Sequence, residues 1–294
     1  MPEITSGEFR AVAVPDKVRI WGQVRSHPVI TFYFLAFAIS WAGFVPALAA
    51  SWGLSLFNHR FWTALLILPA TGPALAAWIT PRLAGDKRSA LFRLREAVRW
   101  RVDGRWYLVA AFFPAVILLV ANSLSRWSLP HHSPTFPPLN APGVLIAVAI
   151  AVVANPWEEV GWRGFALTRL QVNHNASLAA FIVGVLWALW HIPLFLWPGS
   201  LMSRSPFWVW SVAVIGESFL FAWLYNSAGQ SLAVVALFHV SWNTCAAAAG
   251  VDSPLVLTAV TICAVLAILL AFGTTLAGEK TSDRTKDRCA SSLN

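Results

Sequence analysis

The sequence predicts an all-α fold, a polytopic transmembrane helix bundle of about eight spans. Hydrophobic residues make up 57% of the 294 residues and charged residues only 12%, against about 25% in an ordinary soluble domain. The mean hydropathy is +0.63. A soluble fold of this length could not bury that much apolar surface. The composition therefore excludes a typical soluble enzyme, a disordered chain and a small disulfide-linked secreted domain.

Eight apolar stretches are long enough to form the spans, because a helix needs about 20 apolar residues to cross a bilayer. They lie at residues 29–50, 61–81, 106–124, 142–168, 176–197, 206–226, 231–249 and 254–276. The fourth is the least regular, since its apolar part runs straight into Glu158 and Glu159. A continuation of this helix to about Leu170 would move both acidic residues toward the middle of the membrane.

Basic residues set the expected orientation. The formal net charge is +8, and the linker 82–105 carries eight basic residues: Arg82, Lys87, Arg88, Arg93, Arg95, Arg99, Arg101 and Arg105. The positive-inside rule places this linker, the N-terminal segment 1–28 and the tail 277–294 in the cytoplasm. We therefore expect a multi-pass protein of the cell membrane with both termini cytoplasmic. An amphipathic helix at 87–101 would lie on the lipid surface, which favours anionic lipid over nucleic acid as the partner.

Ionisable side chains inside apolar spans are costly and usually face the interior of a helix bundle. One such group begins at Asn155 and reads Asn-Pro-Trp-Glu-Glu-Val-Gly-Trp-Arg. Glu159 and Arg163 are four residues apart, with the glutamate first, which is the favourable order for an ion pair on a helix. Glu158 lies about 100° around the same helix. The segment therefore predicts a free carboxylate beside a supporting ion pair.

Two later segments add histidines. His191 follows Trp187 by four residues, and Asn243 follows His239 by four, so each pair shares one helix face. A single buried histidine usually only completes the packing, and a His–Asn pair often only bonds a neighbouring helix. Taken with Glu158, however, the segments supply a carboxylate, two histidines and an amide from three spans. These are the groups needed to activate water and to stabilise an oxyanion.

The three segments resemble the motifs of the CPBP family of intramembrane proteases, named for CAAX-protein and bacteriocin processing and also called Abi. Its motifs are EExxxR, FxxxH, and HxxxN or HxxxD. The chain carries them in that order as Glu158-Glu159-Val-Gly-Trp-Arg163, Trp187-Ala-Leu-Trp-His191 and His239-Val-Ser-Trp-Asn243. The resemblance covers a core at 141–250 and leaves flanking spans at 29–140 and 251–276. Trp187 stands where phenylalanine is usual, from which we expect a packing change and no loss of chemistry.

The resemblance implies an intramembrane endopeptidase related to the CAAX prenyl endopeptidase. Glu158 would be the general base, and His191 would help to hold and polarise the attacking water. His239 and Asn243 would stabilise the oxyanion of the tetrahedral intermediate, with Glu159 and Arg163 as the supporting ion pair. The implied substrate is a peptide or membrane protein, prenylated or not.

Several alternatives stay open at this point. Glu158, His191 and His239 could bind a catalytic zinc or another divalent metal, but no HExxH motif is present and Asn243 suits an oxyanion better, so we favour catalysis without a metal or other cofactor. A non-proteolytic scaffold or immunity protein would not need the complete set. A proton-coupled transporter would predict internal repeats, which are not clear here. Glu217, in the sixth span, could bond within the bundle or line a cavity.

Overall fold

The computed structural model describes residues 25–57, 62, 64–85, 98–129, 131–198 and 200–277. This part of the chain is helical, apart from loops and one isolated β-bridge between Phe136 and Val251. The predicted segments 1–28, 87–101 and 277–294 fall mostly outside the described residues, so the lipid-surface helix stays a prediction.

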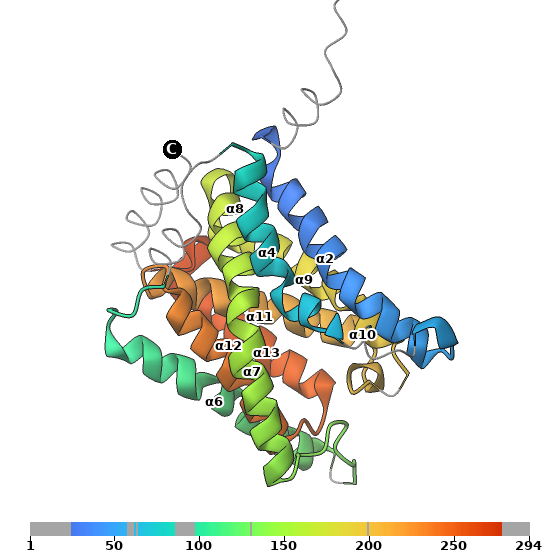
Figure 1. Ribbon diagram of the computed structural model, residues 1–294. Coiled ribbons are helices and arrows are strands. Elements are labelled where there is room, and N and C mark those ends of the chain that lie inside the picture. The colour runs from blue at the N-terminus through green and yellow to red at the C-terminus, as the bar shows by residue number, and fades with distance from the viewer. Residues whose placement is uncertain are drawn as a thin grey trace, which may run out of the picture.

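Eight long helices form a bundle within the described residues (Figure 1). They are α2 (Pro28–Ser51), α4 (Ile67–Leu83), α6 (Gly104–Ser128), α7 (Ala141–Gly161), α9 (Ala176–Trp190), α11 (Phe207–Ser227), α12 (Leu232–Ala249) and α13 (Pro254–Phe272). By length and composition, seven helices in the described residues can cross a membrane. The other, α4, has 17 residues and contains Pro73 and Pro81. The predicted helical membrane bundle is confirmed.

Polar caps fix the starts of the helices that carry the three motifs. The side chain of Asn140 accepts a hydrogen bond from a backbone N–H at the start of α7, Asn175 does so for α9, and Ser231 for α12. Backbone N–H groups in a first helical turn have no partner within the helix, so these caps stabilise the helix starts. The caps therefore fix the residue at which each motif-bearing helix begins.

The helix that carries the two adjacent glutamates is longer than one ordinary span. It passes from α7 through a π-helical turn, η2 (Trp162–Leu167), into α8 (Thr168–Asn173), and runs for 33 residues in all (Figure 1). The expected continuation to about Leu170 is confirmed. A π turn widens the helix locally and often occurs at functional sites, and here it begins at Trp162, shortly after Glu158 and Glu159.

Helix α11 is the most buried of the candidate spans in the described residues, and α7 joins two other helices. Helix α7 lies against α4 and α12, and α11 lies against α9 and α13. Gly161 permits the close approach of α7 to α4, because a Cβ atom there would lie 2.5 Å from the Cβ of Pro73. Gly184 plays the same part between α9 and α11, where a Cβ atom would lie 2.9 Å from the Cα of Ile215.

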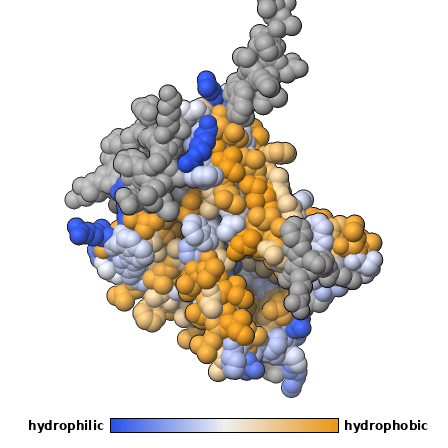
Figure 2. All heavy atoms as spheres, viewed as in Figure 1, coloured by the Kyte–Doolittle hydropathy of each residue, from blue (hydrophilic) through white to orange (hydrophobic). Residues whose placement is uncertain are grey.

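The outer surface of the bundle is strongly apolar. Figure 2 shows hydrophobic residues over much of the middle of the visible face, with the most hydrophilic residues toward its edges. Individual large apolar side chains are almost fully exposed, such as Leu270 at 89% and Trp127 at 82%. So much exposed hydrocarbon is typical of a surface that contacts lipid.

Candidate active site

Glu159 lies at the centre of a buried polar cluster. Its side chain is completely buried, and its Oε1 accepts hydrogen bonds from Nη1 of Arg163 at 2.9 Å and from Nδ1 of His239 at 2.8 Å. The ion pair expected from the four-residue spacing is therefore present. The second bond joins α7 to α12, so two of the three motifs meet at one carboxylate oxygen.

His239 is oriented by this bond. The carboxylate of Glu159, already paired with Arg163, is an acceptor, so Nδ1 of His239 carries the proton between them. The imidazole ring packs edge-to-face against Trp187, with centroids 5.5 Å apart, and against Phe221, at 5.3 Å. Nε2 is the nitrogen left for a further partner.

Glu158 has different partners from its neighbour in sequence. Its Oε2 accepts hydrogen bonds from the indole N–H groups of Trp187, at 3.2 Å, and Trp162, at 3.4 Å. The residue is 8% exposed, and within the described part of the chain it forms no ion pair. The expected difference between the two glutamates therefore has a structural basis, since only Glu159 pairs with Arg163.

His191 ends α9 and precedes the short helix α10 (Ile192–Leu196). Its Nδ1 lies 2.8 Å from the carbonyl oxygen of Trp187. Because a carbonyl can only accept, Nδ1 is the protonated nitrogen and Nε2 keeps a free lone pair. The ring is held edge-on between Trp190 and Trp210, whose ring centroids each lie 4.6 Å away.

Asn243 lies outside this bonded cluster. It is one helical turn beyond His239 on α12, it is exposed, and it makes no hydrogen bond with another residue that the structure describes. The structure thus brings Glu158, Glu159, Arg163, His191 and His239 together and leaves Asn243 beside them. Its assignment to the oxyanion stays a prediction.

Trp187 has contacts that the sequence analysis missed. Besides bonding Glu158 and His191, its indole lies 4.6 Å below the guanidinium carbon of Arg163 and edge-on to His239. It therefore touches each member of the cluster except Glu159. The signal in the sequence was the replacement of phenylalanine by tryptophan, which adds an N–H donor to an aromatic ring.

Glu217 lies apart from the hydrogen bonds of this cluster. It lies in the middle of α11, is 9% exposed, and has no hydrogen bond with a described residue. It interacts electrostatically with Arg163, whose guanidinium carbon lies 4.0 Å from the ring of Phe221, one turn further along α11. The bundle hydrogen bond considered for Glu217 is absent from the described structure, which leaves the cavity-lining alternative as a prediction.

The donor set for a metal is not gathered at one point. Within the described residues, no three histidine, cysteine, aspartate or glutamate side chains are placed so that they could hold one ion. The hydrogen bonds at Oε2 of Glu158 and at Nδ1 of both motif histidines would not prevent metal binding, because a metal-ligating histidine usually bonds its other nitrogen to an oxygen; the placement of the three side chains is what argues against one shared ion. A zinc site built from Glu158, His191 and His239 would require these side chains to move.

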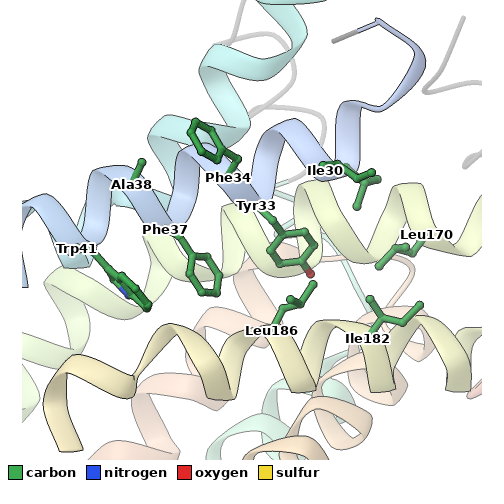
Figure 3. A pocket seen from close by; sticks show the side chains of 10 residues that line it. Ile30, Tyr33, Phe34, Phe37, Ala38, Trp41, Leu170, Ile182 and Leu186 are labelled. Carbon is green, nitrogen blue, oxygen red and sulfur yellow. The ribbon is translucent and has the colours of Figure 1, made fainter. Parts of the chain in front are cut away.

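An apolar groove of about 670 Å³ lies beside the cluster, between α2 on one side and α8 and α9 on the other. Figure 3 shows Tyr33, Phe37 and Trp41 of α2 facing Ile182 and Leu186 of α9. The Tyr33 ring stacks on Trp162 at 5.9 Å, and Trp162 in turn bonds Glu158. One pair of aromatic rings therefore separates the groove from the Glu158 carboxylate.

Comparison with known proteins singles out the same part of the chain. A family model described as type II CAAX prenyl endopeptidase Rce1-like matches residues 140–245. Across this segment the chain is similar to that family. The match confirms the resemblance to the CPBP and Rce1-like family, and the segment contains every residue of the predicted site.

One curated relative is similar over a shorter stretch. The protein named CAAX prenyl protease 2 of Methanococcus maripaludis is 40% identical over 45 residues, which are 15% of this chain and 17% of the relative. The chain thus matches less than a fifth of that relative's length. This similarity supports the family resemblance over the matched stretch and does not extend to the activity of the whole protein.

Proposed function

We propose that the protein is an intramembrane endopeptidase that hydrolyses a peptide bond of a membrane-associated peptide or protein. The observation that carries this proposal is the meeting of Glu158, His191 and His239, from three segments of the Rce1-like region, around one buried tryptophan. A carboxylate and two oriented imidazoles are sufficient polar groups for hydrolysis by an activated water.

In the proposed reaction, Glu158 accepts a proton from a water molecule while Nε2 of His191 holds the same water. The water oxygen bonds to the carbonyl carbon of the substrate, and the carbonyl π electrons move onto its oxygen. When the carbon–nitrogen bond breaks, the proton passes from Glu158 to the leaving amine. Atoms and charge balance over the cycle, because Glu158 returns to its ionised form.

His239 would stabilise the oxyanion by donating from Nε2. This requires a proton on both ring nitrogens, with Nδ1 bonded to the Glu159 carboxylate at 2.8 Å. Asn243, exposed one turn further along α12, would supply a second donor when the substrate is bound. Glu159 and Arg163 would act by positioning His239.

We propose that the reaction needs no metal. Among the described residues, Glu158, His191 and His239 are not grouped so that together they could hold one metal ion. A hydrogen-bonded cluster of this kind supports acid–base chemistry by the side chains themselves.

The groove between α2 and α9 supports a lipidated substrate. Its walls are apolar and aromatic, and it lies one ring pair away from Glu158 (Figure 3). A hydrocarbon chain attached close to the cleaved bond could lie there while the peptide reaches the polar cluster. We therefore place a prenylated or otherwise lipid-modified peptide first among the substrates to test.

The test is peptide cleavage by the purified full-length protein in liposomes, with prenylated and unprenylated CAAX reporter peptides. We expect the wild type to cleave, Glu158→Gln to lose about 10³-fold or more in kcat/KM, and a strong chelator to leave the rate unchanged. Loss of activity with the chelator would overturn the metal-free mechanism. Full activity of Glu158→Gln would overturn the role of Glu158, and no cleavage of either peptide would favour a non-proteolytic scaffold.

A further inference from the structure

Two tryptophans bind the same oxygen of Glu158. Trp187 comes from α9 and Trp162 from the first position of the π turn η2, and both donate an indole N–H to Oε2. An ionised carboxylate oxygen has two lone pairs. Both lone pairs of Oε2 are therefore occupied, while the described residues place no hydrogen bond on Oε1 of Glu158.

We propose that Trp187 and Trp162 are positioning residues whose indole N–H groups hold Oε2 of Glu158 and leave Oε1 to take the proton of the attacking water. This inference rests on the proposed hydrolytic function. A proton on Oε2 would lie against the indole N–H groups that already donate to that oxygen. Oε1 is therefore the favourable acceptor for the proton of the water. The two indoles thereby select the oxygen that reacts.

Packing makes both indoles rigid. The Trp187 ring lies 4.6 Å from the guanidinium carbon of Arg163 and edge-on to Phe221 at 5.6 Å. The Trp162 ring, completely buried, stacks on Tyr33 at 5.9 Å and lies edge-on to Trp190 at the same distance. Donors fixed in this way hold a carboxylate in one orientation without a further loss of side-chain freedom during the reaction.

The two donors are not equivalent. The bond from Trp187 is 3.2 Å long and that from Trp162 is 3.4 Å, and the usual range for N–H···O bonds ends near 3.2 Å. Trp187 is therefore the stronger donor. Phenylalanine at either position keeps an aromatic ring but removes the N–H and part of the ring volume, so the hydrogen bond is isolated only by comparison with a buried Trp→Phe variant that loses the same volume.

The kinetic test compares three Trp→Phe variants of the full-length protein in liposomes. We expect Trp187→Phe to lower kcat about tenfold to a hundredfold with little change in KM, as for loss of a hydrogen bond to a charged group, and Trp162→Phe to lower kcat less. Trp223→Phe is the matched control, because its buried indole N–H has no partner among the described residues and it lies outside the cluster. Equal kcat values for Trp187→Phe and Trp223→Phe would overturn the proposal.

A spectroscopic test does not depend on cleavage. In protein labelled with ¹⁵N-tryptophan, the indole resonance of Trp187, identified by its absence in Trp187→Phe, should shift in Glu158→Leu, which removes the acceptor. It should stay near its wild-type position in Glu158→Gln, whose amide oxygen can still accept. If no peptide is cleaved, the proposed function fails while this shift still decides whether the indoles hold Glu158. An unshifted resonance in Glu158→Leu overturns the inference in either case.

Discussion

At the scale of single residues, Oε1 of Glu159 does more than pair with Arg163. It accepts from the guanidinium and from His239 together, and all three side chains are buried. A buried charge that loses its partner costs several kcal/mol, whereas removal of both partners costs much less. Glu159 therefore has two roles, because its single charge both stabilises the buried Arg163 and orients the imidazole of His239.

Glu159→Gln tests this double role. The glutamine can still accept hydrogen bonds but leaves the Arg163 charge without compensation, so we expect the free energy of unfolding in detergent to fall by about 3 kcal/mol and cleavage to be lost. Glu159→Gln with Arg163→Met removes both charges, and we expect it to recover part of the stability but not the activity. A double variant whose loss equals the sum of the two single losses would show that the pair is not coupled.

The residues of the cluster were predictable to different degrees. The pair of Glu159 with Arg163 follows from a four-residue spacing on one helix. The bond from His239 joins residues 80 apart and that from Trp187 joins residues 29 apart. These depend on how each helix is rotated about its own axis, which the apolar pattern of a lipid-exposed bundle does not determine. Hence sequence reasoning selected the side chains that the structure brings together and missed their indole partners.

At the scale of elements, the contact between α7 and α4 at Gly161 sets the position of Glu158, three residues earlier. A Cβ atom on Gly161 would lie 2.5 Å from Cβ of Pro73 and 2.8 Å from its backbone carbonyl. A backbone carbonyl cannot rotate away as a flexible side chain can. Alanine at this position must therefore push α7 and α4 apart.

We expect Gly161→Ala to reduce the free energy of unfolding by about 1–3 kcal/mol and to lower kcat, since Glu158 moves with the helix. Denaturation in detergent and the cleavage assay measure the two effects. Gly104→Ala is the control, because a Cβ atom at the start of α6 meets nothing within 4 Å. A Gly161→Ala protein as stable as the Gly104→Ala protein would contradict the close contact.

At this scale the sequence predicted the extent of the fourth helix but not its π turn. The fourth helix was expected to continue to about Leu170 because this moves the acidic pair toward the middle of the membrane, and it does continue. The change from an α turn to a π turn at Trp162–Leu167 was not predicted. A π turn adds one residue to a single turn, which leaves the average apolar spacing of a 33-residue helix almost unchanged.

At the scale of the whole molecule, composition was a sufficient guide to the class of fold. An apolar fraction of 57% required a membrane bundle, and seven helices in the described residues are long and apolar enough to cross a membrane. The predicted cytoplasmic placement of both termini rests on basic residues that lie largely outside the described part of the chain, so it stays a prediction. The lateral groove beside the site was not foreseen, because its walls come from helices more than 100 residues apart in sequence, such as Trp41 and Leu186.

The groove leads to a prediction about substrate choice. Ile182 lines it on α9 and points toward α2 (Figure 3), so Ile182→Trp should fill part of the space. A hydrocarbon chain enters the groove from lipid and not from water. Its free energy of binding therefore comes from closer packing. We therefore expect a modest rise in KM, about three- to tenfold, for the prenylated reporter, with kcat and the KM of the unprenylated peptide unchanged. Leu270→Trp, on the exposed face of α13, is the matched control and should change neither constant. An equal rise in KM for both peptides in Ile182→Trp would mean that the groove holds peptide, or only supports the site, and does not select the lipid.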